Sequence, residues 1–187
     1  MDKLADYGWY VNGSMPIMKV FESAKNGILK NTALIDKEMI KHYKAEKKDI
    51  KRKLIKEFPD RSSLFLEAFK CHDKKFFSAS TSLFISQADG ILAGKLFVIS
   101  KEKKSLKDFL NASPQSEYIY DMLTKIRGLD CYTADISKYS SNLNRHNIMH
   151  GFSTDYGTEI NSLKALSLLS FIADFQTRTK RPATNSK

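Results

Sequence analysis

The chain has few of the residues that cross-link or interrupt a fold. Its 187 residues include two cysteines, four prolines and eight glycines. Cys71 and Cys131 are too few for a disulfide scaffold and form no Cys-x-x-Cys pair, so we expect a reducing, cytoplasmic setting. No apolar run approaches the roughly eighteen residues needed to cross a bilayer. Residues 1–15 do not join a basic region to an apolar block, so we expect no secretory signal and no membrane partner.

Sustained alternation of apolar and polar residues is also lacking, which leaves no clear β-strands. Helical spacing is frequent instead, so the sequence predicts an all-α protein. The length fits one domain, which we place at residues 1–175. The polar, basic segment 176–187 is expected to be a disordered tail.

Apolar spacing and capping signals predict where the helices lie. The segment 34–58 carries one apolar stripe, formed by Met39, Tyr43, Ile50, Leu54 and Phe58. The segment 78–99 is apolar enough to be the central, most buried helix, and its Gly90 and Gly94 share a face that permits close helix packing. Further helices are expected over 14–29, 61–77, 133–149 and 155–175, with short pieces at 104–110 and 116–126.

Acidic residues are scarce relative to basic ones. Lys and Arg total 31 against 21 Asp and Glu, which gives a net charge of +10. Such an excess favours a polyanionic partner, either nucleic acid or an anionic membrane surface, although it can also serve only solubility. Four basic side chains of the segment 34–58 could follow an RNA backbone by releasing counterions, or could be a solvated face: Lys44, Lys48, Lys51 and Arg52.

Two of the four histidines stand in the short stretch 144–151, Asn-Arg-His-Asn-Ile-Met-His-Gly. One interpretation is purely structural, because a left-handed glycine commonly ends a helix and histidine suits its last turn. Another is a zinc site, because His146 and His150 are four apart and face one side of a helix. That site needs a third ligand from elsewhere, such as Asp89 or Asp155.

The third interpretation is RNA cleavage without a metal or other cofactor. A base must remove the 2′-hydroxyl proton, for which histidine is well suited, and a fixed cation must stabilise the phosphate. His150 and Arg145 supply these groups. On an ideal helix they would point roughly 140° apart. They would therefore meet on one phosphate only if the helix is irregular or if a two-fold axis pairs two copies of the segment.

These residues resemble the motif of the HEPN superfamily of ribonucleases: Arg, four to six residues, then His, with a polar residue directly after the Arg. Arg145, His146 and His150 fill these places. The stretch 84–92, "FISQADGIL", resembles the central helix of that superfamily, and 156–169, "YGTEINSLKALSLL", resembles the helix after the motif. The order of elements agrees over roughly residues 60–175.

The resemblance implies an all-helical bundle, a symmetric homodimer and metal-independent cleavage that leaves a 2′,3′-cyclic phosphate. His150 would be the general acid/base, Arg145 the phosphate ligand and His146 a polar helper. Asp89 could orient either residue or pair with a lysine, and Asn144 and Asn147 could bind phosphate or cap a turn. Superfamily members often act as toxins or in phage defence, which implies an antitoxin or defence-system partner.

Some superfamily members have lost activity, so the alternative is a silent helical module that binds RNA or a protein. One branch carries a modified Tyr two places after the His, where this chain has Phe152.

Overall fold

Helices form every regular element in the part of the chain that the computed structural model describes, which is residues 2–28, 30–94, 96–99, 129, 141 and 143–180. The all-α prediction is confirmed. The elements are α1 Asp2–Asp6, α2 Ile17–Ile28, α3 Thr32–Glu57, the 3₁₀ turn η1 Pro59–Arg61, α4 Ser62–Asp73, α5 Phe77–Ile91, α6 Leu96–Ile99, α9 Arg145–Met149 and α10 Glu159–Lys180. Among these residues, no helix is both long and apolar enough to span a bilayer.

The expected short helices at 104–110 and 116–126 lie outside the described residues, as does the end of the expected tail, 181–187. The start of that tail is helical, because α10 continues to Lys180.

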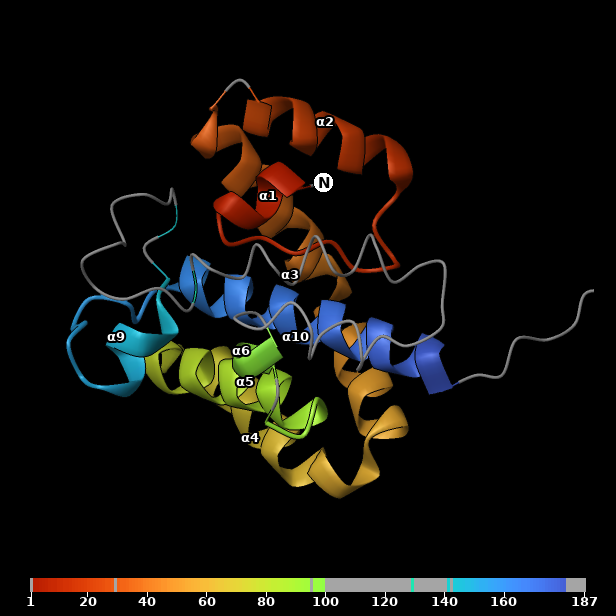
Figure 1. Cartoon of the computed structure of the whole chain (residues 1–187), viewed down its shortest axis with the longest axis vertical. Coiled ribbons are helices and arrows are strands. Elements are labelled where there is room, and N and C mark those ends of the chain that lie inside the picture. Colours follow the sequence, from red (N-terminus) through yellow and green to blue (C-terminus); the bar gives the residue numbers. More distant parts are fainter. Residues whose placement is uncertain are drawn as a thin grey trace, which may run out of the picture.

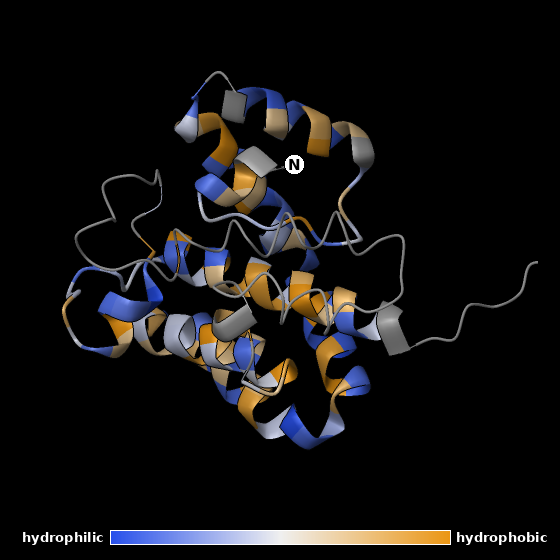
Figure 2. Cartoon of the chain, in the orientation of Figure 1, coloured by the Kyte–Doolittle hydropathy of each residue, from blue (hydrophilic) through white to orange (hydrophobic). Residues whose placement is uncertain are grey.

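α10 is the most buried helix of the described chain. Every residue from 161 to 175 is buried. In Figure 1 this helix crosses the middle of the molecule, with α4 and α5 on one side and α1 and α2 on the other. α10 packs against α5 and α3, and apolar residues recur along it between more polar ones in Figure 2. The prediction that 78–99 is the most buried helix is therefore wrong, since α5 leaves Ser78, Ala79 and Ser86 exposed.

The predicted helix 78–99 is two helices, α5 and α6. Between them, Ala93 and Gly94 have left-handed backbones with φ of 55° and 76°. The side chain of Asp89 accepts a hydrogen bond from the Leu96 N–H at 2.9 Å, which fixes the start of α6. The glycines do not pack against another helix backbone. Gly90 lies under the Arg61 guanidinium, and a Cβ at Gly94 would meet nothing within 4 Å.

α3 follows its prediction closely. Met39, Tyr43, Ile50 and Leu54 are buried on one stripe. His42 is also buried, and its Nε2 lies 3.0 Å from Asn12 Oδ1. On the other side of α10, buried His72 places Nδ1 2.8 Å from Ser162 Oγ. Burial lowers the pKa of both imidazoles, which suits neutral rings that hold buried hydrogen bonds.

Residues 7–15, which we call the N-terminal strap, cross the polar stripe of α10. The Tyr10 N–H donates to Ser167 Oγ at 3.1 Å. Further along, Asn12 Nδ2 donates to Ser170 Oγ at 3.1 Å, and the Gly13 N–H donates to Asp174 Oδ2 at 2.6 Å. Serine and aspartate side chains thus take the place of a neighbouring β-strand for this extended segment. Their burial is tolerated because each has a partner.

One buried ammonium joins the strap, α3 and α10. Lys164 is only 5% exposed, and its Nζ lies 5.6 Å from the centroid of the Trp9 ring and 3.7 Å from Asp36 Oδ1. The same carboxylate oxygen accepts a hydrogen bond from Trp9 Nε1 at 2.7 Å. Burial lowers the pKa of Lys164 and the Asp36 carboxylate opposes that shift, so desolvation outweighs the attraction.

We expect the two partners to respond unequally to substitution. Asp36→Ala should lower the free energy of unfolding by about 3 kcal/mol, because it leaves a buried ammonium without its counterion and removes the acceptor of Trp9. Lys164→Met should leave it unchanged or raise it by about 1 kcal/mol, since the desolvated charge disappears. Urea unfolding at pH 7 measures both. Adding Lys164→Met to Asp36→Ala should recover part of the loss. Equal losses from the two single changes would contradict the account.

Candidate active site

The candidate site is built on α9, a helix of five residues, Arg145–Met149. The Asn144 side chain caps it by accepting the Asn147 N–H at 2.8 Å, and Asn144 itself is extended, with φ −125° and ψ 115°. Ser141 Oγ accepts the Leu143 N–H at 3.2 Å just before. The predicted helix 133–149 is therefore too long where it can be checked, because the described residues before Arg145 are not helical. Its first residues lie outside the described chain.

Gly151 ends α9 in the left-handed conformation that the sequence predicts, with φ of 72°. The Gly151 N–H donates to Ile148 O at 3.2 Å, and the Phe152 N–H donates to Asn147 O at 2.8 Å. This pair of bonds is the Schellman arrangement, which folds the chain back against the last helical turn. It fixes both His150, at the C-terminal cap, and Phe152.

Three aromatic rings meet at this end of α9, and we call His146, His150 and Phe152 the ring cluster. The two imidazole centroids are 4.4 Å apart. The Phe152 centroid lies 6.3 Å from that of His146 and 6.1 Å from that of His150. His150 and Phe152 are exposed and His146 is half-buried. The i, i+4 spacing thus brings the two histidines together as expected.

Arg145 points to a different neighbour. Its guanidinium carbon lies 4.4 Å from the centroid of the Phe97 ring, which is buried in α6. The Leu96 N–H, next to Phe97 in α6, donates to the Asp89 side chain. Asp89 and Arg145 therefore contact neighbouring residues of the same short helix. The structure therefore gives the predicted site residues two contacts: the imidazole pair, and the contact of Arg145 with Phe97.

The loop after the ring cluster is fastened to α5 and α10. The Tyr156 carbonyl accepts a hydrogen bond from Asn161 Nδ2 at 3.1 Å, and Thr158 Oγ1 accepts the Asn161 N–H at 3.2 Å. A Cβ at Gly157 would lie 3.3 Å from the Ser78 Cβ, so the loop passes close over the start of α5. Asn161 is buried in α10, so the most buried helix holds the loop that follows the ring cluster.

The zinc interpretation needs a third ligand near the two imidazoles. Among the described residues, no group of three or more His, Cys, Asp and Glu is arranged to hold a metal ion. Asp89 Oδ1 accepts the Leu96 N–H, and Asp155 Oδ1 accepts the Ser153 hydroxyl at 3.1 Å. In the described chain, neither acid completes a site with His146 and His150.

The basic residues predicted to follow RNA are partly neutralised. Lys44 Nζ lies 2.8 Å from Glu159 Oε2, at the first residue of α10. Arg52 pairs with Asp49 within α3, and Lys51 lies over Phe69 at 5.9 Å from the ring centroid. Lys48 is exposed. The basic face of α3 thus begins near the loop that follows the ring cluster, and its net charge is lower than its lysine content indicates.

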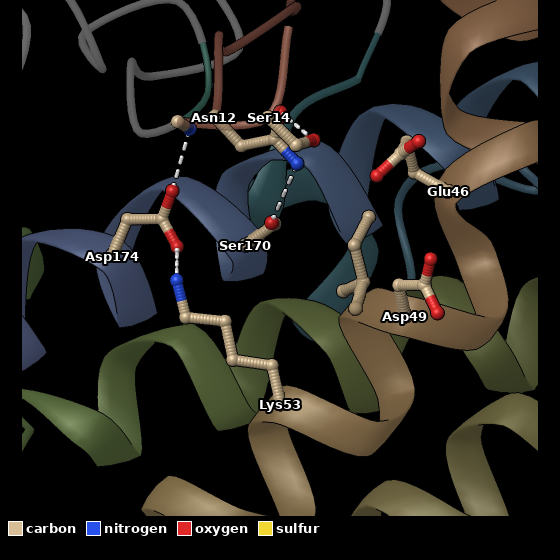
Figure 3. Close-up of a pocket in the computed structure, with 9 residues that line it drawn as sticks. Asn12, Ser14, Glu46, Asp49, Lys53, Ser170 and Asp174 are labelled. Carbon is tan, nitrogen blue, oxygen red and sulfur yellow. Dashed lines mark hydrogen bonds and ion pairs between the residues drawn. The ribbon is translucent and has the colours of Figure 1, made fainter.

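A pocket of about 270 Å³ lies elsewhere, between the strap, α3 and α10. It is lined by Asn12, Gly13, Ser14, Glu46, Asp49, Ile50, Lys53, Ser170 and Asp174. Figure 3 shows Lys53 and Asp174 pointing toward one another, and they pair at 2.5 Å. With three carboxylates and one ammonium, the pocket does not suit a phosphate, and none of the predicted site residues lines it.

Two aromatic side chains of the site were not predicted from the sequence. Phe152 could have been found, because in His-Gly-Phe at a helix end the residue after the glycine packs back on the last helical turn. The sequence does not indicate the contact between Phe97 and Arg145, because the two residues are about fifty positions apart in the chain.

No family model, no curated protein and no solved structure matches the chain. A function must therefore be argued from its own residues.

Replacing Gly151 tests whether its backbone conformation positions the ring cluster. Gly151→Ala should cost about 1 kcal/mol of unfolding free energy, because alanine resists the left-handed conformation while its methyl group meets no atom. Gly94→Ala is a matched control, since Gly94 has the same backbone hand and the same open surroundings. Both should lose similar stability in urea. Only Gly151→Ala should shift the NMR signals of the His146 and His150 rings. Unchanged ring signals would contradict the positioning role.

Proposed function

We propose that the chain is a homodimeric, metal-independent endoribonuclease of the HEPN type. His150 would act as general acid/base, Arg145 as the phosphate ligand and His146 as a polar helper. As in the superfamily that the motif resembles, its setting would be that of a toxin or phage-defence effector with a protein partner that restrains or activates it.

The observation that carries the proposal is the set of residues that α9 and its capped ends bring together. A five-residue helix, closed by Asn144 at one end and Gly151 at the other, carries Arg145, His146 and His150. The two imidazoles lie with centroids 4.4 Å apart, at the surface end of this helix. Structural capping accounts for Asn144 and Gly151, but it does not account for two neighbouring imidazoles, one of them exposed, at the end of this helix.

The chemistry balances with these groups alone. One imidazole nitrogen of His150 takes the 2′-hydroxyl proton while the 2′ oxygen attacks phosphorus. The bond from phosphorus to the 5′ oxygen breaks, and a protonated imidazole returns a proton to the leaving oxygen. The guanidinium stabilises charge on the non-bridging oxygens, for which its planar fork is suited. The products are a 2′,3′-cyclic phosphate and a 5′-hydroxyl.

The dimer is part of the proposal because of where Arg145 lies. Its guanidinium lies over the Phe97 ring, and the two imidazoles lie beside Phe152. A two-fold axis near residues 140–160 would let the guanidinium of one copy approach the imidazoles of the other. The interface would then complete the site.

The same contact supports the second candidate, a catalytically silent module that binds RNA or a protein through its basic surface. If Arg145 serves only to cover Phe97, its loss should lower stability rather than activity. The two candidates therefore predict opposite results for the same variants.

We expect Arg145→Ala and His150→Ala each to slow RNA cleavage by about 10²–10⁴-fold, because each removes a group that acts in the chemical step. Arg145→Lys should restore little, since an ammonium lacks the two-pronged phosphate contact. RNA affinity should fall far less. Cleavage of a mixed RNA pool in EDTA, RNA affinity and melting temperature are measured for each variant.

Lys25→Ala serves as the control, since Lys25 is exposed and lies on α2, which carries none of the predicted site residues. It should leave the cleavage rate at saturating RNA unchanged. A wild-type chain that cuts no better than its variants, while Arg145→Ala melts several degrees lower, would establish the silent module instead. Activity that disappears in EDTA and returns with zinc would move the assignment to a metal-dependent hydrolase.

A further inference from the structure

Phe152 is more exposed than its structural role requires. In a Schellman ending, the residue after the glycine usually covers part of the last helical turn. Phe152 does so by lying against His146, yet it remains 67% exposed, which is among the highest values for a large apolar side chain in the described chain. Its backbone is fixed by the Phe152 and Ser153 N–H groups, which both donate to Asn147 O, at 2.8 and 3.1 Å.

His150 and Phe152 therefore give the ring cluster an aromatic surface that is exposed to solvent. The Phe152 plane is tilted by only 33° from that of His150 and by 39° from that of His146. A flat ligand can lie over Phe152 and touch an imidazole at the same time. Flat, sequence-tolerant stacking on an aromatic side chain is how single-stranded nucleic acids are commonly held.

We propose that Phe152 is the floor of a nucleobase subsite, which stacks the base of a nucleotide next to the phosphate that lies at His150. The inference rests on the proposed function in placing RNA at α9, and it adds the substrate class. A base inside a duplex has both faces covered by its neighbours, so only an unpaired base can lie on Phe152. The substrate is then a single strand, a loop or a bulge.

Charge favours this occupant over an apolar protein surface. The chain carries a net charge of +10, and Arg145 lies in the stretch that bears the ring cluster. Lys44, at the start of the α3 basic face, pairs with Glu159 just beyond the loop that carries Phe152. A strand whose base lies on Phe152 can therefore continue toward cationic side chains.

The test uses RNA analogues that cannot be cut. Affinities of the full chain are measured for a short 2′-O-methyl single strand and for the duplex of the same sequence. The single strand carries a fluorescent adenine analogue whose emission falls on stacking. Phe152→Leu removes the ring and keeps an apolar side chain, and Phe152→Tyr keeps the ring. Phe21→Leu is the matched control, because Phe21 is 63% exposed on α2.

We expect Phe152→Leu to weaken single-strand binding roughly 5- to 150-fold and to abolish the fluorescence loss, whereas Phe152→Tyr and Phe21→Leu behave as the wild type. Duplex binding should not depend on Phe152. Equal single-strand affinity for Phe152→Leu and wild type would overturn the subsite, as would equal weakening for strand and duplex.

The oligomeric state of each variant is measured by light scattering in the same buffer. A Phe152→Leu chain that dissociates, with binding lost only in parallel, would make Phe152 a dimer contact and not a base-stacking residue, and would overturn the subsite. Because the analogues cannot be cleaved, the binding result stands apart from activity. Binding of the expected pattern without any cleavage of natural RNA would refute the ribonuclease and keep the subsite.

Discussion

A helix buried on every side must find partners for its polar side chains inside the protein, and the rest of this structure depends on how α10 does so. One stripe of α10, ending at Asp174, holds the N-terminal strap. Ser162 faces His72 and Ser80 on the opposite side. Asn161 holds the loop that follows α9. The same helix therefore fixes the N-terminus, the α4–α5 layer and the candidate site.

The sequence predicts the fold where one apolar stripe decides the outcome. α3 has such a stripe, and its bounds differ from the predicted ones by one or two residues. The sequence-based prediction fails where polar contacts between distant segments decide how deeply a helix is buried or where it ends. α10 contains several serines and Lys164, so its pattern does not indicate complete burial, which depends on partners far away in the chain. At the break between α5 and α6, the Asp89 side chain accepts the Leu96 N–H. The spacing of apolar residues does not predict such a hydrogen bond.

At the candidate site, too, the features set by the local sequence were predictable and those set by distant contacts were not. Its local features were readable: Gly151 as a left-handed terminus, Asn144 as a cap, and two histidines on one face. The placement of Arg145 against Phe97 was not, because it depends on how α6 docks beside α9. That placement puts the guanidinium of Arg145 over Phe97 in one chain, and the proposed activity therefore includes a second copy that completes the site.

The central claim is that α9 directs a 2′-hydroxyl attack on RNA. The most direct test is the chemical identity of the cut ends. A defined unpaired RNA is incubated with the purified chain in EDTA, and the products are identified by mass spectrometry. The account predicts a 2′,3′-cyclic phosphate on one fragment and a 5′-hydroxyl on the other, since the 2′ oxygen is the nucleophile. Fragments that carry a 3′-hydroxyl and a 5′-phosphate would show that water attacked instead, and would contradict it.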